Sequence, residues 1–221
     1  MSGTVGTAER NGARGRIDKR EAILRAAIAV FAREGYAQAG VDVIAAEAGV
    51  AQPTVYNHFG DKETLFRQAI TADSDRELAE NLAVVERLQD RDGDVPAMLE
   101  DVAHRLLVCY CDDRSCALRR LVYAELAQFP DLIDIVRGRA ADRVTDALAD
   151  KLARLSLAGR LGKLDPDEAA EQLIALLTGP VEARARLGTR RVPDDELRAV
   201  ARAAVRTFLH AFAARPDERG R

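Results

Sequence analysis

The sequence predicts an all-α protein with a small N-terminal head and a larger helical body. Three observations support this prediction. The chain of 221 residues is rich in Ala, Leu, Arg and Glu, which are strong helix formers. Runs of β-branched and aromatic residues, which favour strands, are missing. Apolar residues recur along most of the chain with the spacing of one helix face.

The head is expected to contain a long helix followed by two short ones. The first helix should run from near Ile17 to Glu34, because apolar residues recur at i, i+3, i+4 and i+7 from Leu24. Gly35 follows as a residue that can take a positive φ and end the helix.

Two short helices joined by a glycine predict a helix-turn-helix. The first is expected over about Val41 to Ala48 and is stopped by Gly49, and the second over about Gln52 to Asn57. A turn at 58–60 should follow, and Asp61 is a good N-cap for the next helix.

The body is expected to consist of longer helices, the first running from Asp61 to about Arg91. Further helices are expected at Val95 to Cys111, Ser115 to Gln128 and Pro130 to Gly159. Another should follow the cap Asp165, with a break at Gly179-Pro180, and the last should cover Asp194 to Ala214. The predicted division is a flexible basic arm at 1–15, a helix-turn-helix domain at 16–60, a larger helical domain at 61–214, and a flexible tail at 215–221.

Charge and composition exclude several classes of protein. The net charge of −3 and the pI near 5.7 argue against a protein that coats nucleic acid non-specifically. They leave room for a small DNA-binding surface, since residues 10–20 contain five basic residues and one acid. No apolar stretch approaches ~20 residues, and the first residues lack the apolar centre of a signal peptide, so a cytoplasmic protein is expected.

The second short helix carries the side chains best suited to reading DNA. A Gln at a helix N-terminus, here Gln52, can hydrogen-bond base edges, and Pro53 and Thr54 can contact a thymine methyl group. Tyr56 and His58 can donate to phosphates. Lys62, in the first turn of the next helix, combines its ammonium group with free backbone N–H groups.

Each of these features also has a simpler interpretation. A glycine between two short helices is common in helical proteins, and a basic N-terminus is often only a disordered tail. A histidine such as His58 at a helix end is often a cap. Their combination favours DNA binding, because each simpler interpretation would have to hold independently.

The head also resembles the tetracycline-repressor (TetR) family of bacterial regulators. The resemblance rests on Val41 to Ala45, Ala48-Gly49-Val50, Thr54 to Phe59, Asp61-Lys62-Glu63 and Leu65-Phe66. It implies that Gln52, Pro53, Thr54 and Tyr56 contact bases or phosphates and that His58 and Lys62 hold phosphates. One departure is Gly40, which stands where the family usually has Thr or Ser; glycine can cap the helix but offers no hydroxyl group. The candidate DNA-binding residues are Arg14, Arg16, Gly40, Gln52, Pro53, Thr54, Tyr56, Asn57, His58 and Lys62.

The resemblance further implies a ligand pocket in the body and a dimer formed by the last two long helices. Pocket candidates are Leu106, Tyr110, Tyr123, Glu125 and Phe129, although helical aromatics are commonly plain core and Glu125 could instead pair with a nearby arginine. The low aromatic content and many alanines suit an apolar effector of moderate size. Residues 118–122, Glu125 and Phe129-Pro130 also resemble one subgroup of these regulators, which is broad in its ligands.

Apolar stripes on the last two helices are candidates for the dimer interface. They contain Leu173, Leu177, Val200, Ala204, Phe208 and Phe212. The alternative is that these stripes pack into the core of the single chain.

Three clustered cysteines, Cys109, Cys111 and Cys116, could form a redox or soft-metal switch, but buried structural thiols are favoured. They contain no CxxC pair, and His104 is the only histidine nearby, so no metal site is expected.

The sequence therefore predicts a ligand-controlled DNA-binding repressor that binds a palindromic operator as a homodimer, without a cofactor and away from the membrane. The alternatives are a helical interaction or sensor protein without DNA binding, and an enzyme of unrecognised type. The chain has no GxSxG, HExxH or glycine-rich nucleotide loop, so no enzyme is expected.

Overall fold

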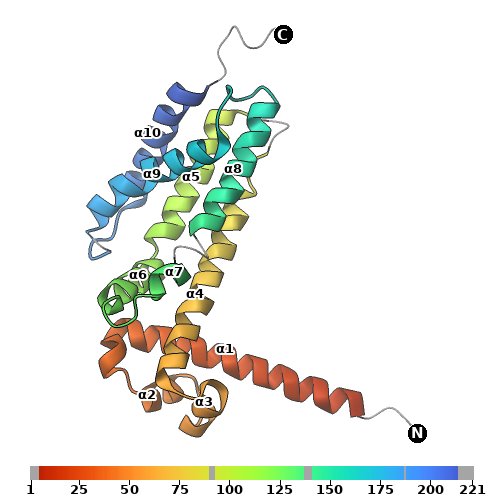
Figure 1. Ribbon diagram of the computed structural model, residues 1–221, viewed down its shortest axis with the longest axis vertical. Coiled ribbons are helices and arrows are strands. Elements are labelled where there is room, and N and C mark those ends of the chain that lie inside the picture. The colour runs from red at the N-terminus through yellow and green to blue at the C-terminus, as the bar shows by residue number, and fades with distance from the viewer. Residues whose placement is uncertain (1–4, 90–92, 137–140, 187, 214–221) are drawn as a thin grey trace. The chain divides into compact units, whose positions relative to one another are not determined.

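The computed structural model describes residues 5–89, 93–136, 141–186 and 188–213, with side chains from residue 16 onward. These residues form ten helices and no strand (Figure 1), which confirms the predicted all-α fold. The chain divides into two compact units. The head unit contains the residues up to 73 together with 121–132, and the body unit contains 74–120 and the residues from 133 onward.

The head unit contains α1 (Val5–Gln38), α2 (Val41–Glu47), α3 (Gln52–Phe59) and the first part of α4 (Lys62–Val85). Helix α2 packs against both α1 and α3. The largest fully buried side chains of this unit are Ile23, Phe31, Ile44, Leu65, Phe66, Ile70 and Leu132. Apolar contacts between the three helices and α4 therefore fix the position of α3 within the unit.

Helix α1 begins at Val5, earlier than the expected start near Ile17, so the segment predicted as a flexible arm is mostly helical backbone. Its Ala, Glu and Arg residues are good helix formers. The expected end after Glu34 is confirmed by a break at Gly35, which has φ 75°. Only a glycine takes this conformation without strain, and it separates the last turn of α1 from the rest.

The connection between α2 and α3 has the glycine geometry that the sequence predicts. Gly49 has φ 68°, and a Cβ added to it would meet nothing within 4 Å. The backbone torsion, and not lack of space, is therefore what requires glycine here. Helix α3 extends to Phe59, slightly beyond the expected Asn57, and Gly60 N–H closes it by donating to Tyr56.

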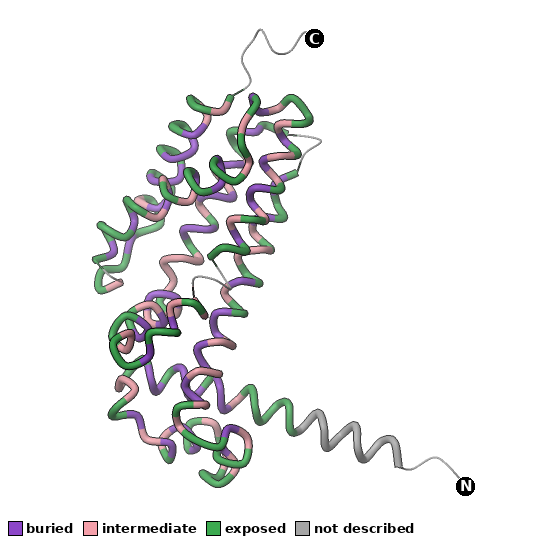
Figure 2. Tube along the Cα trace, in the orientation of Figure 1, coloured by how far each residue is buried: buried purple, intermediate pink, exposed green. Residues whose placement is uncertain are grey.

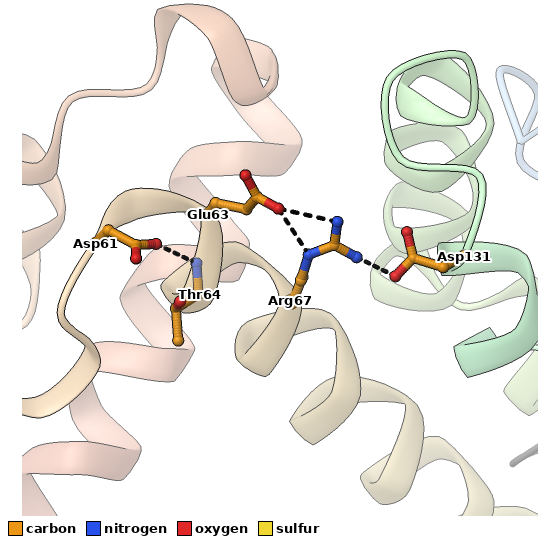
Figure 3. Close-up of polar contacts among 5 residues, drawn as sticks. All are labelled: Asp61, Glu63, Thr64, Arg67 and Asp131. Carbon is orange, nitrogen blue, oxygen red and sulfur yellow. Dashed lines mark hydrogen bonds and ion pairs between the residues drawn. The ribbon is translucent and has the colours of Figure 1, made fainter.

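The predicted cap of α4 is present. Asp61 Oδ1 accepts a hydrogen bond from Thr64 N–H across 2.7 Å (Figure 3). This bond lowers the pKa of the Asp61 carboxyl group. Helix α4 therefore starts at Lys62 with its first turn secured by the residue before it.

The body unit is built around α5 (Val95–Cys111), α8 (Asp142–Leu157), α9 (Pro166–Ala185) and α10 (Asp194–Phe212). Helix α10 packs against α5 and α9, and α9 packs against α8. Figure 2 shows buried and exposed positions alternating along these helices, as amphipathic helices require. Asp94 and Asp165 cap α5 and α9 with their side chains, and the cap at Asp165 confirms the expectation.

Several expected boundaries in the remaining helices are wrong. The helix expected from Pro130 to Gly159 starts at Leu132 and is described as α7 (Leu132–Val136) and α8, with 137–140 outside the described residues. Leu132 is buried in the head unit, whereas the rest of α7 and all of α8 belong to the body unit. Helix α6 is Asp113–Glu125, and α4 ends at Val85.

The break expected at Gly179-Pro180 is also absent, because α9 runs through both residues. Leu177 and Val181, on either side of this pair, are buried to 1% and 0% exposure. Packing on both sides thus outweighs the hydrogen bond that proline removes. Within the described residues, none of the helices combines the length and the apolar character needed to cross a bilayer.

Candidate nucleic-acid interface

Helix α3 is amphipathic over only two turns. Val55 and Phe59 are buried at 1% and 4% exposure and anchor it in the head unit. The predicted base- and phosphate-contacting side chains occupy the rest of the helix surface. Gln52, Pro53, Tyr56 and Asn57 are exposed, whereas Thr54 and His58 are half-buried. The helix thus presents a polar face with an exposed tyrosine on a fixed scaffold.

Lys62 lies in the first turn of α4 and is held in place by the end of α1. Its Nζ donates to the Ala37 carbonyl across 3.2 Å and lies 4.8 Å from the centre of the Tyr36 ring. The side chain is half-buried. The ammonium group therefore has a defined position, which favours a contact with one phosphate over a diffuse attraction.

The arm residues divide between described and undescribed side chains. Arg16 is exposed on α1, whereas the side chain of Arg14 lies outside the described residues. Arg20, a further basic residue of this segment, donates to Gln68 Oε1 across 2.6 Å and lies 5.6 Å from the centre of the Phe59 ring. Arg20 thus contributes to packing around α3.

Gly40 is the N-cap of α2 and makes no side-chain cap bond. Its φ of −87° is open to any residue. A Cβ added there would lie 2.3 Å from Asp42 Oδ1, so the Asp42 side chain would have to rotate away. The glycine is therefore compatible with the cap position but supplies no group for DNA.

The five pocket candidates fall into both units. Leu106 is buried in the body unit, and Tyr110 donates its hydroxyl hydrogen to Glu182 Oε1 across 2.7 Å. Tyr123, Glu125 and Phe129 belong to the head unit. Tyr123 is 48% exposed, and Phe129 is 3% exposed.

Glu125 pairs differently from the expected contact with an arginine. Its Oε1 accepts a hydrogen bond from the backbone N–H of Tyr36 across 3.0 Å. Sequence reasoning missed Tyr36, because nothing in its local pattern distinguishes it from a residue that merely follows a helix-ending glycine.

The dimer candidates lie mostly inside the single chain. Leu173, Leu177, Val200, Ala204 and Phe208 are buried at 1–4% exposure, and Phe212 is half-buried. The core of the body unit thus already occupies these side chains, as the alternative interpretation held.

The three cysteines are free, with Cys116 buried and the other two half-buried. Burial raises the pKa of the Cys109 thiol and raises the pKa of Cys111 to about 11. A thiol with such a pKa is a poor nucleophile near neutral pH. Among the described residues, no group of three His, Cys, Asp or Glu side chains could hold a metal ion.

Two family models match this chain. Residues 23–69 match the model described as "Bacterial regulatory proteins, tetR family". Residues 97–214 match "AefR-like transcriptional repressor, C-terminal domain". Together the two matches include both the helix-turn-helix and most of the body.

Curated relatives are similar at lower identity. The uncharacterised HTH-type transcriptional regulator YezE of Bacillus subtilis is 25% identical over 150 residues, which cover 67% of this chain and 75% of YezE. The HTH-type transcriptional activator FasR of Mycolicibacterium smegmatis is 41% identical over 78 residues, covering 30% of this chain and 36% of FasR.

Solved structures share the fold over nearly the whole chain. A TetR-family transcriptional regulator from Mesorhizobium loti superposes with a TM-score of 0.83 at 28% identity, covering 90% of this chain and 98% of that one. The flavonoid-responsive regulator FrrA superposes with a TM-score of 0.68 at 26% identity, covering 89% and 98%.

Proposed function

Because this chain belongs to the TetR family of bacterial transcriptional regulators, we propose that it is a repressor that binds a near-palindromic operator as a dimer and leaves it when a small molecule binds. The observation that carries this proposal is the exposed polar face of α3 on its two buried anchors. In this proposal the protein acts in the cytoplasm and without catalysis.

The DNA contacts are assigned by position on the head unit. Gln52, Pro53 and Thr54, at the N-terminus of α3, face base edges, which is the part of a recognition helix that enters the major groove. Tyr56, Asn57, His58 and Lys62 contact the backbone, and Arg14 and Arg16 follow it from α1. Base contacts then set specificity, while phosphate contacts set register and salt dependence.

The dimer is proposed to form through the outward faces of α9 and α10. Small exposed residues recur every four positions on both helices, namely Ala175, Gly179 and Ala183 on α9 and Ala199, Ala203, Thr207 and Ala211 on α10. Small side chains allow helices to approach closely. Exposed acids on α9 (Glu168, Glu171) and exposed arginines on α10 (Arg198, Arg202, Arg206) are complementary if α9 of one copy meets α10 of the other.

A dimer would place two recognition helices about one turn of DNA apart, ~34–36 Å, which explains the proposed palindrome. An effector that binds better to a form of the dimer with a different distance between the recognition helices would release the DNA. A coupling free energy of ~3 kcal/mol would give a response of roughly 100-fold.

The effector is proposed to be an apolar small molecule bound in the body, where Leu106 and Tyr110 lie. FrrA, whose description names a response to flavonoids, makes planar aromatic compounds a reasonable first panel to screen. Activation is the second candidate mode of regulation, because FasR is described as an activator.

DNA selection from a random pool tests the proposal directly. The wild-type protein should enrich a near-palindromic sequence, and the Tyr56→Ala/Lys62→Ala variant should bind that sequence at least tenfold more weakly. Arg105→Ala, which removes an exposed arginine paired with Asp101 in the body unit, serves as the control and should bind like wild type. Enrichment of no sequence would disprove the function, and unchanged binding by the double variant would disprove the site.

A further inference from the structure

The segment 121–132 belongs by its contacts to the head unit, although about fifty residues of the body unit precede it in the chain. It comprises the end of α6, the connection at 126–131 and Leu132, the first residue of α7. Phe129 and Leu132 from this segment are buried at 3% and 0% exposure. The segment is therefore part of the core that supports the DNA-binding helices.

The segment contacts the end of α1 through one carboxylate. The break at Gly35 is followed by Tyr36, whose N–H donates to Glu125 Oε1 across 3.0 Å. A Cβ added to Gly35 would lie 3.7 Å from the same oxygen. Glu125 thus lies against the two residues that form the break.

Tyr36 connects this contact to the phosphate-binding lysine. Its ring centre lies 4.7 Å from that of Phe129 and 4.8 Å from that of Phe66. The Lys62 ammonium lies 4.8 Å from the centre of the same ring and donates to Ala37, the next residue of the chain. Glu125 therefore holds the backbone of Tyr36, and Lys62 contacts the ring of Tyr36 and the carbonyl group of the next residue.

A second contact fixes the same segment to α4. Arg67 pairs with Asp131 of the segment and with Glu63 of its own helix (Figure 3). The Arg67 guanidinium also lies 5.1 Å from the centre of the Phe129 ring. The segment thus contacts Tyr36 of α1 through Glu125 and Arg67 of α4 through Asp131. Tyr36 and Arg67 lie on either side of Lys62 in the sequence.

We propose that Glu125 is a positioning residue for DNA binding: it acts through Tyr36 to hold the Lys62 ammonium where an operator phosphate meets it. This inference rests on the proposed function, because it needs an operator.

The test is a double-mutant cycle in the full-length protein, with operator affinity and its salt dependence as readouts. Lys62→Ala should weaken binding and lower the slope of log affinity against log salt by about 1.8, the value for two phosphate contacts, one from each copy of the dimer. Glu125→Ala should weaken binding about tenfold and lower the slope by the same amount. The double variant should bind no more weakly than Lys62→Ala alone, because both changes remove the same phosphate contact from each copy.

Two further variants separate positioning from general damage to the fold. Glu125→Gln keeps an oxygen that accepts the Tyr36 N–H, so it should restore binding to within about twofold of wild type. Tyr36→Leu keeps the backbone bond but removes the ring, and it too should show no additional effect in the Lys62→Ala background. Glu86→Ala removes a carboxylate paired with Lys151 across 2.7 Å in the body unit and should leave binding unchanged.

The possible outcomes are distinct. Additive losses, or an unchanged salt slope in Glu125→Ala, would overturn the inference while leaving the proposed function intact. If Glu125→Ala fails to fold, the Glu125→Gln and Tyr36→Leu cycles decide the question by the same criteria. A wild-type protein that selects no DNA would overturn both the inference and the proposed function.

Discussion

His104 Nε2 and Asp194 Oδ1 lie 2.7 Å apart, which joins α5 to the first turn of α10. Arg198 Nε donates to the other oxygen of the same carboxylate across 2.7 Å. These two hydrogen bonds, the one from Arg198 first, lower the pKa of Asp194 below its usual value near 3.8. The ionised carboxylate therefore stabilises the folded body unit, helped by its place at the N-terminus of a helix.

Asp194→Asn should lower the urea midpoint of unfolding at neutral pH. The pKa is lowered on folding, so the stabilisation is present above the usual pKa near 3.8 and is lost as the pH falls through the lowered value. The difference between wild type and variant should therefore shrink in acid. Asp195→Asn, in the same helical turn but outside this pair, is the control. An equal difference at all pH values would contradict the assignment.

Gly49→Ala should destabilise the protein by about 1 kcal/mol, because φ is positive and L-residues are strained there. No clash is expected, since the space around the residue is open. Gly49→Asn should cost less, because asparagine tolerates this conformation better. Urea unfolding measures both variants; a larger loss for asparagine than for alanine would mean that packing, not torsion, requires the glycine.

In the monomeric chain, Gly179→Ala should raise the free energy of unfolding by about 0.5–1 kcal/mol, because this glycine lies inside α9, is exposed and has open space at its Cβ. Pro180→Ala should raise it further, since proline removes a hydrogen bond inside the helix. Both measurements need one fixed protein concentration, because dimerisation is linked to stability. A loss of stability accompanied by a loss of dimer would show that the face of this helix is used for assembly.

Ala203→Arg should convert the proposed dimer into a monomer. Ala203 is one of the small exposed residues of α10, so the bulk of an arginine there would keep the facing helix from approaching closely. Operator affinity should fall by about 100-fold or more, because two linked contacts become one. Sedimentation and band shift measure the two effects. Ala97→Arg, at an exposed alanine of α5, should change neither; a dimeric Ala203→Arg variant would exclude this interface.

Features encoded by local chemistry could be predicted from the sequence. The bounds of α5 and the caps at Asp61 and Asp165 follow from residues within one turn of each helix end. The turn around Gly49 is equally local. The exposed face of α3 follows from its two apolar anchors, so the arrangement of Gln52 and Tyr56 on one short helix was also predictable.

Features that depend on distant residues could not be predicted. Helix α9 continues through Pro180 because residues on both sides are buried against other helices. The apolar stripes that contain Leu173 on α9 and Phe208 on α10 have the same periodicity whether they pack within one chain or between two chains. Glu125 is separated from Tyr36 by 89 positions, and no local pattern announces that pairing.

The head unit is discontinuous in the chain, which matters for building hybrid regulators. Joining residues 1–73 to a foreign sensor would leave Phe66 and Tyr36 without Phe129, and Arg67 without Asp131. A working hybrid would have to retain residues 121–132 from this chain. Recombination at a single crossover after the recognition helix would therefore yield a head that lacks part of its own core.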